Sequence, residues 1–169
     1  MPTPVFATFL EELEARTAIE DCLKRFARAV DRQDWKAARE AYHDGAFDDH
    51  GFFKGPPDAF LAHIEKLHAV QHHSMHFNTN VLIEFKSREH AFVETYVLVL
   101  QRFADKRVTA SARYLDRFEK RGGAWRVAHR TLVFGDMVSE PMAEPPRFPP
   151  EFTVQKHGMD DPLYSLRKK

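Results

Sequence analysis

Cysteine is nearly absent from this chain of 169 residues, in which Cys22 is the single example. One cysteine excludes a disulfide within the chain and a metal site built from several thiolates. Because Cys22 falls among the apolar positions of a predicted helix, we interpret it as an inert, buried thiol. Long apolar runs are missing too, since no stretch approaches the roughly 20 residues that span a membrane. We therefore expect neither a disulfide-stapled domain nor a membrane-embedded one.

A targeting signal and an excess of charge are also missing. The N-terminal sequence MPTPVFATFLEELEAR has no basic region and turns acidic at Glu11, so it does not fit a signal peptide. We expect a soluble, cytoplasmic protein. The 25 Lys and Arg residues equal the 25 Asp and Glu residues, and they are spread along the chain. This balance argues against nucleic acid as the main partner, and no membrane partner is expected.

Phenylalanine, in contrast, is abundant, with 15 residues. We expect most of these rings to lie in the core. Some of them are expected to line an apolar pocket, because aromatic rings give a large contact area with little rotamer entropy to lose.

Helices are predicted in the first part of the sequence. Apolar residues recur every three to four positions over residues 8–32, which predicts a long amphipathic helix. Asp34 is a suitable N-cap for a second, shorter helix. The segment AFDDHGFFKGPP is typical of a short strand or hairpin, and its two prolines stand where a third helix begins.

Strands are predicted in the second part. Short charged or glycine-containing connections, namely KSREH, ADK and RGG, separate the strand-like runs, which predicts an antiparallel meander. Helices followed by long antiparallel strands indicate an α+β fold with the helices on one face of the sheet. The runs are MHFNTNVLIEF, AFVETYVLVLQRF, RVTASARYLDRFEK and AWRVAHRTLVFGDM.

The C-terminal part has a different composition, because six of the ten prolines fall between Pro141 and Pro162. This predicts an extended, non-helical arm. The arm either packs across the domain or a neighbouring subunit, or it is disordered. We divide the chain into a domain over residues 1–138 and a Pro-rich arm over residues 139–169.

The stretch HHSMHFNTN places an unusual number of polar residues at the start of a strand. Met75, Phe77 and every second residue after them are expected to face the core, with His76 and Asn78 on the other face. A metal site needs three or more converging ligands, and His72 and His76 lie too far apart for one ion on a straight strand. We therefore expect no metal. Asp31, at the end of the first helix, is from the residues alone either a solvated acid or an N-cap.

Three segments together resemble the SnoaL-like branch of the nuclear transport factor 2-like superfamily, which includes scytalone dehydratase and lindane dehydrochlorinase. The resemblance covers about residues 10–138, and YLDRFEKRGGAWRVAHR is its most specific part. It implies a cone-shaped α+β barrel, in which a curved antiparallel sheet wraps around N-terminal helices and encloses one deep pocket. The segments are ARTAIEDCLKRFARAVDRQDWKAAREAYHDGAFDDHGFFKGP, MHFNTNVLIEF and SARYLDRFEKRGGAWRVAHR.

The resemblance also implies a catalytic pair, because dehydratase and dehydrochlorinase members use an Asp at the end of the first helix and a His on a later strand. Asp31 and His76 match these positions, whereas His72 and His73 are expected in the loop. The pair needs no metal and no organic cofactor. We expect the substrate to contact hydrogen-bond donors, a polar wall and aromatic rings. The candidate donors are His50, Tyr96 and Arg113, the wall includes Asn78, and the rings are Phe26, Trp125 and Phe134.

Phe26 is a departure from these relatives, which carry Lys or Tyr about five residues before the catalytic Asp. The expected function is a cofactor-independent lyase that eliminates water or a comparable group from a small hydrophobic, aromatic or cyclic molecule. An isomerase or a formaldehyde-releasing lyase with the same pair is an alternative. So is a non-catalytic ligand- or partner-binding module, or the β subunit of a ring-hydroxylating dioxygenase. A homodimer or homotrimer is expected from the resemblance.

Overall fold

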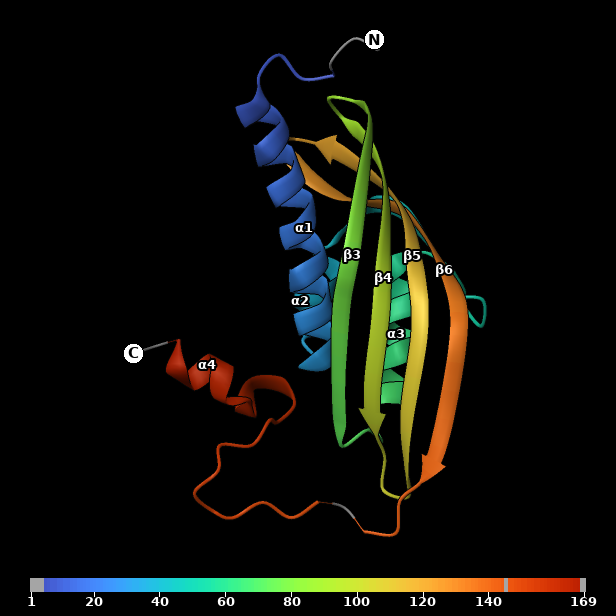
Figure 1. Ribbon diagram of the computed structural model, residues 1–169, viewed down its shortest axis with the longest axis vertical. Coiled ribbons are helices and arrows are strands. Elements are labelled where there is room, and N and C mark those ends of the chain that lie inside the picture. The colour runs from blue at the N-terminus through green and yellow to red at the C-terminus, as the bar shows by residue number, and fades with distance from the viewer. Residues whose placement is uncertain (1–4, 145, 168–169) are drawn as a thin grey trace.

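The computed structural model describes residues 5–144 and 146–167, which form helices packed against one curved sheet (Figure 1). None of the helices in these residues combines the length and the apolar sequence needed to span a lipid bilayer. The helices are α1 (Phe9–Asp31), α2 (Trp35–Arg39), α3 (Pro57–His68), the 3-10 turn η1 (Gly158–Asp160) and α4 (Pro162–Leu166). The strands are β1 (Tyr42–Asp49), β2 (Lys54–Gly55), β3 (His73–Ser87), β4 (His90–Arg102), β5 (Lys106–Arg121) and β6 (Ala124–Pro141).

Helix α1 follows the predicted range closely, and both of its ends have a local cause. A capping box starts it, since the Thr8 side chain accepts from the Glu11 N–H and Glu11 accepts from the Thr8 N–H, both at 3.2 Å. The helix ends at Asp31 because Gln33 takes a left-handed conformation, with φ of 55°. Asp34 then caps α2, as predicted, by accepting from the Ala37 N–H at 3.0 Å.

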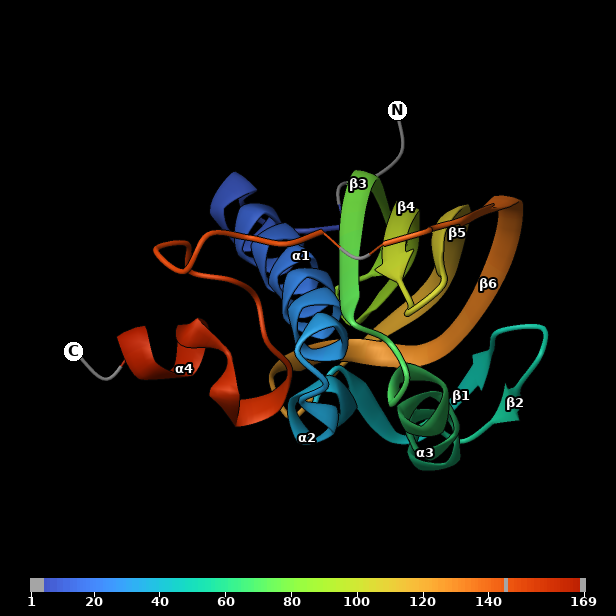
Figure 2. The same cartoon turned by 90° about the horizontal axis from the view of Figure 1, so that it is seen from below.

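The sheet has six strands in the order β2-β1-β6-β5-β4-β3. Strands β3 to β6 form the predicted antiparallel meander, and the α+β class with a curved sheet around N-terminal helices is confirmed. The sheet is not antiparallel throughout, however, because β1 pairs in parallel with β6. It is also not closed, since β2 and β3 remain its two edges. Figure 2 shows α1, α2 and α3 on the concave side of the sheet.

Strand β3 does not keep the same faces along its whole length, contrary to the predicted alternation. Asn80 has a φ of 47°, and the pairing with β4 shifts between Thr79 and Leu82. This bulge reverses which side chains face inward. Before it, Asn78 faces α1, whereas Phe77 is 41% exposed on the outer face; after it, Ile83 is buried. The expectation that Phe77 lies in the core is therefore wrong.

The phenylalanines are more exposed than expected, because only Phe26, Phe60 and Phe118 are buried among the described residues. Phe6, Phe53 and Phe85 are partly buried against the core, and most of the other rings are exposed. The large abundance of phenylalanine is thus not explained by core packing alone. More than a third of the side chain is exposed for Phe9, Phe47, Phe52, Phe77, Phe92, Phe134, Phe148 and Phe152.

The C-terminal arm packs against the domain, which was one of the two alternatives. It is not wholly non-helical, because it contains η1 and α4. The arm returns to the turn after α1, where the Gly158 N–H donates to the Arg32 carbonyl at 2.6 Å. The Tyr164 hydroxyl donates to Asp34 at 2.9 Å, and Gln155 donates to the Ser74 carbonyl at 3.1 Å. The arm therefore contacts both the turn that follows Asp31 and the start of β3, whose side chains bond to Asp31.

Candidate active site

Asp31 and His76 form a hydrogen-bonded pair where the end of α1 meets the start of β3. The Nδ1 atom of His76 lies 2.6 Å from Oδ1 of Asp31. The backbone N–H of His76 donates to Oδ2 of the same carboxylate at 2.9 Å, and the Ser74 hydroxyl donates to Oδ1 at 3.2 Å. The side chains of Asp31 and His76 are only 7% and 11% exposed. Three donors from β3 therefore fix the carboxylate on the concave side of the sheet.

The charge state of this pair suits proton transfer. Burial by itself would raise the pKa of Asp31, but the hydrogen bonds from His76 and Ser74 outweigh it and lower that pKa. An ionised Asp31 accepts the Nδ1–H of His76 and leaves Nε2 as the basic nitrogen. The arrangement can thus remove a proton from a bound molecule and stabilise the imidazolium that results.

Two polar side chains beside the pair each have a buried atom without a hydrogen-bond partner among the described residues. They are Oδ1 of Asn78 and Nδ1 of His68. The amide nitrogen of Asn78 donates to the Leu23 carbonyl of α1 at 3.1 Å, which holds the side chain on the concave face. Burial, together with the nearby charge of His76, lowers the pKa of His68 to about 4. His68 is therefore a neutral neighbour of the pair at pH 7.

Deeper in the fold, Arg130 forms a second pair with Asp116. The guanidinium Nε and Nη2 donate to the two carboxylate oxygens of Asp116 at 2.8 and 2.7 Å. Asp116, Arg130 and Asp48 are register partners on β5, β6 and β1, and all three are fully buried. We call these three residues the charge ladder. The Arg130 guanidinium also stacks on Tyr114 and Phe26, at 3.9 and 4.7 Å from their ring centroids.

His50, a predicted substrate-binding residue, joins the charge ladder at Asp48. Its Nδ1 is hydrogen-bonded to Oδ1 of Asp48, and the Tyr42 hydroxyl donates to Oδ2 at 2.6 Å. The His50 ring stacks on Phe60, with centroids 4.2 Å apart, and lies 6.0 Å from the Tyr114 ring. His50 is thus a buried member of the core network, with one ring nitrogen already bound to a carboxylate.

Tyr114 contacts the charge ladder through the guanidinium of Arg130. The pKa of Tyr114 is raised to about 12, mainly by burial; the charge of Arg130 opposes this rise, and the charges of Asp48, Asp116 and Asp31 contribute to it. The phenol is therefore neutral at pH 7. Phe26, the predicted lining ring, packs edge-on against Tyr114 at 6.5 Å and is 4% exposed.

Two of the predicted donors lie on the wrong face. Tyr96 and Arg113 are register partners on β4 and β5, next to the inward-facing Val97 and Ala112, so they point to the outer face. Tyr96 is 45% exposed, and Arg113 forms an ion pair with Glu94 at 2.6 Å. Neither side chain reaches the Asp31–His76 pair within one chain, because successive residues of a strand alternate between faces.

The remaining residues that the sequence analysis discussed do not come together at one site. Trp125 lies at the opposite end of the sheet from His76, packed on Phe85 with centroids 5.9 Å apart, so it does not line the same site. Phe134 is a register partner of the buried Ala112 and shares the inward direction, but it is 51% exposed. His73 is the first residue of β3 rather than a loop residue, whereas His72 precedes the strand as predicted.

Sequence reasoning missed Ser74, His68, Tyr114 and the Asp116–Arg130 pair. One signal was present: a charged residue occurs at an inward position of each neighbouring strand, in YLDRFEK and in VAHRTL. Three cavities, of about 630, 410 and 600 Å³, are lined by residues other than Asp31 and His76. No group of three or more His, Cys, Asp or Glu side chains in the described parts is arranged to hold a metal ion.

The match to a known family covers most of the chain. Residues 11–131 match the SnoaL-like domain, and this range includes both members of the Asp31–His76 pair. The chain belongs to the SnoaL-like domain family. The resemblance inferred from the sequence is thereby confirmed.

Relatives of this SnoaL-like chain include characterised dehydrochlorinases. The gamma-hexachlorocyclohexane dehydrochlorinase of Sphingobium indicum is 29% identical over 126 residues, which are 72% of this chain and 81% of that protein. Hexachlorocyclohexane dehydrochlorinase 1 of the same species is 27% identical over 124 residues, which are 70% of this chain and 80% of that protein. Dehydrochlorinases are lyases, so the relatives of the chain support an elimination of lyase type.

Solved structures show the same fold. A scytalone dehydratase-like protein from Novosphingobium aromaticivorans superposes with a TM-score of 0.73 at 19% identity, covering 81% of this chain and 95% of that one. The dehydrochlorinase LinA gives a TM-score of 0.70 at 25% identity, covering 83% of this chain and 98% of that one. The predicted fold is thus shared with these cone-shaped neighbours.

Proposed function

We propose that the chain is a cofactor-independent lyase in which His76 is the catalytic base and Asp31 orients it. The observation that carries the proposal is the 2.6 Å contact between Nδ1 of His76 and Oδ1 of Asp31 at a buried position. In this geometry the Nε2 lone pair of His76 is available to remove a proton from the substrate. An ionised Asp31 favours the imidazolium formed in that step.

The reaction is an elimination. His76 takes a proton from a carbon, the electron pair of the C–H bond forms a double bond, and a hydroxide or halide leaves from the neighbouring carbon. The unpaired Oδ1 of Asn78 supplies an acceptor on the same face as His76, suited to a substrate hydroxyl. His50 remains a candidate donor through its second ring nitrogen, because Asp48 occupies the first.

The substrate is a small hydrophobic molecule, aromatic or cyclic. Phe26, Tyr114 and Phe134 supply inward-facing rings on the concave side, and such rings favour flat or cyclic apolar partners. The names of the sequence relatives suggest halogenated cyclohexanes as first candidates. Phe26 stands where those relatives are expected to carry a polar side chain, which favours a different substrate or leaving group.

The experiment is a screen of halogenated and hydroxylated cyclic compounds, with and without a chelator, measuring halide release or the new double bond. For any compound that turns over, His76→Asn should reduce kcat/KM by about 10²–10⁴-fold. His72→Asn and His73→Asn are matched controls, because both histidines lie outside the pair, and they should leave the rate unchanged. Full turnover by the His76→Asn variant would rule out the proposed mechanism.

We also propose that the protein is a homodimer or homotrimer formed through the outer face of the sheet. Phe77, Tyr96 and Leu98 are 41%, 45% and 40% exposed there, which is a large apolar surface for a monomer. Sedimentation of wild type and of the Leu98→Glu variant tests this. A wild-type monomer at micromolar concentration would contradict it.

A further inference from the structure

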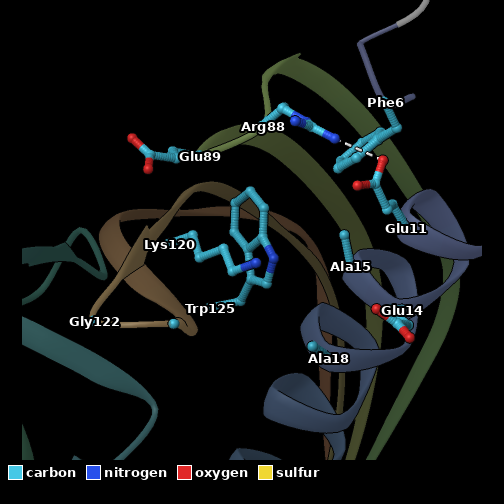
Figure 3. A pocket seen from close by; sticks show the side chains of 11 residues that line it. Phe6, Glu11, Glu14, Ala15, Ala18, Arg88, Glu89, Lys120, Gly122 and Trp125 are labelled. Atoms are coloured by element: carbon cyan, nitrogen blue, oxygen red, sulfur yellow. Dashed lines mark hydrogen bonds and ion pairs between the residues drawn. The ribbon is translucent and has the colours of Figure 1, made fainter. Parts of the chain in front are cut away.

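A groove runs along α1 on the side of the β5–β6 turn, away from the Asp31–His76 pair. It consists of two cavities, of about 630 and 410 Å³, which share Ala18, Gly123 and Trp125 as lining residues. Figure 3 shows the Trp125 ring between Lys120, near the end of β5, and Ala15 and Ala18 of α1. The two cavities thus meet at Trp125, whose side chain forms a wall of both.

The smaller cavity is rich in arginine. Four arginines line it, against the two carboxylates Asp34 and Glu40. The Asp34 carboxylate is already occupied, because it accepts from the Ala37 N–H and from the Tyr164 hydroxyl. The cavity therefore carries an excess of positive charge in a chain whose net charge is zero. The four arginines are Arg25 and Arg28 of α1, Arg126 of β6 and Arg167 after α4.

Arg28 and Arg126 have no ion pair within the part of the chain that the structure describes. Arg25 is 3.9 Å from Asp21, and both side chains are more than half exposed, so this contact is weak. Guanidinium groups that line one cavity in excess over its carboxylates repel one another. A bound anion would relieve this repulsion.

The back wall of the same cavity is apolar and neutral. The apolar lining includes Ala18, Cys22, Trp125 and Leu163. Burial raises the pKa of the Cys22 thiol to about 11, against the opposing charges of Arg130, Arg25 and Arg126. The thiol is thus uncharged at pH 7, and the arginines lie near the apolar wall rather than at a distance from it.

We propose that this arginine-lined cavity binds a small organic anion, with its carboxylate or phosphate group among the guanidiniums and its apolar body against Trp125. Arginine forks bind both groups by paired, charge-assisted hydrogen bonds, and an aromatic wall suits a planar body. A volume of about 410 Å³ lies in the range of small-molecule sites. The site is separate from the Asp31–His76 pair and does not depend on its chemistry.

The charge of the neighbouring cavity fixes the orientation of such a ligand. The larger cavity is lined by three carboxylates, Glu11, Glu14 and Glu89, against Lys120 and an Arg88 that is already paired with Glu11 at 2.6 Å. An anionic group is disfavoured there and favoured on the arginine side of Trp125. An apolar body longer than one ring would extend over Trp125 into the larger cavity.

The probes that test the site are benzoate and phenyl phosphate, each titrated at constant ionic strength and pH 7. Trp125 fluorescence reports occupancy in a Trp35→Phe variant, which leaves Trp125 as the single tryptophan. We expect a saturable fluorescence change with a dissociation constant of about 1 mM or tighter for at least one probe. Comparing the two probes distinguishes a carboxylate site from a phosphate site.

The charge requirement is tested in the same background. Arg28→Gln and Arg126→Gln should each weaken binding about tenfold, whereas Arg117→Gln, on a strand outside the cavity, should not. Benzyl alcohol has the ring without the charge and should not bind, and acetate or inorganic phosphate alone should bind more weakly than the ring-bearing anions. The Asp31→Asn substitution should leave binding unchanged, which separates this cavity from the proposed active site.

Three results would overturn the proposal. The first is no saturable change with either probe at about 10 mM, which exceeds the expected dissociation constant tenfold. The second is equal binding of benzyl alcohol, which would indicate an apolar site only. The third is unchanged affinity in both arginine variants when thermal unfolding shows that they are folded.

Discussion

The Asp31–His76 and Asp116–Arg130 pairs both join a carboxylate to a nitrogen base on the concave side of one sheet, but their surroundings differ. Asp116 and Arg130 are fully buried, two hydrogen bonds join them, and aromatic rings cover the guanidinium. The His76 side chain is 11% exposed, and its pair lies at the end of a helix beside the returning C-terminal arm.

This difference in surroundings and in the type of base decides which pair can exchange a proton near neutral pH. Burial by itself would lower the pKa of Arg130, but Asp116 raises it well above the ordinary value, so the guanidinium keeps its proton at any accessible pH. Imidazole, in contrast, exchanges its proton near neutral pH. The first pair is therefore a structural element of the core, whereas the second can take up and release a proton.

The largest expected effect comes from breaking the core pair. Asp116→Asn leaves Arg130 buried without its bidentate partner, and we expect the free energy of unfolding to fall by about 3–5 kcal/mol. Asp31→Asn should cost only about 1 kcal/mol, because the amide oxygen of the new side chain still accepts from the His76 N–H. Chemical denaturation of both variants at pH 7 measures the two values.

Activity should rank these variants in the opposite order. In the Asp31→Asn variant, the amide nitrogen of the new side chain would donate to Nδ1 of His76, which places the ring proton on Nε2 and removes the base. Turnover should then fall by about 10²–10⁴-fold in a protein of nearly normal stability. If Asp31→Asn lost stability as severely as Asp116→Asn, the contrast between the two pairs would be wrong.

A smaller effect is expected from a change of pH, through His68, the neutral neighbour of the Asp31–His76 pair. The pKa of His68 is about 4 in the folded protein, against 6.5 as the ordinary value. Between about pH 6.5 and pH 4 the unfolded chain binds a proton that the folded chain does not. The free energy of unfolding therefore decreases as the pH is lowered. His68 alone should lower the free energy of unfolding by about 2.5 kcal/mol between pH 7.5 and 4.5.

Denaturation of wild type and His68→Gln at these two pH values tests this expectation. The variant lacks the titrating ring, so its loss of stability should be smaller by about the same 2.5 kcal/mol. Equal losses in the two proteins would show that His68 takes up its proton in the folded state. The Asp116–Arg130 pair should add no such dependence through its guanidinium.

The smallest effect on stability is expected in the C-terminal arm, which lies beside the Asp31–His76 pair. Tyr164→Phe removes the hydroxyl that donates to Asp34 at 2.9 Å and should lower the free energy of unfolding by about 1 kcal/mol. Ser165→Ala, which removes a neighbouring hydroxyl that bonds only within the arm, is a matched control. A larger loss in the control would show that the arm is stabilised elsewhere.

The sequence contained enough to predict the helices, the meander and the residues of the Asp31–His76 pair. Helical spacing places Asp31 at the end of α1, and a family resemblance supplies His76 as its partner. What connects them is a tertiary contact between residues 45 positions apart, and neither spacing nor composition specifies it.

The errors have a common physical source, which is the direction of side chains on strands. Tyr96 and Arg113 have residue types suited to binding, but alternation alone does not say which set of residues faces the helices. The left-handed Asn80 then reverses that assignment within β3. Arg130 was overlooked because a buried arginine is stable only beside a partner such as Asp116, and pairing across strands is not visible in one sequence.

The bulge at Asn80 also has a meaning for protein engineering. It divides β3 into a first half, in which Ser74, His76 and Asn78 face the helices, and a second half, which packs Ile83 and Phe85 into the core. Because pairing with β4 is interrupted between the halves, a change of size or polarity in the first half need not be matched in the second. Libraries confined to Asn78, the inward-facing residue next to His76 in sequence on this face, would therefore explore new substrate preferences while the second half of the strand stays as it is.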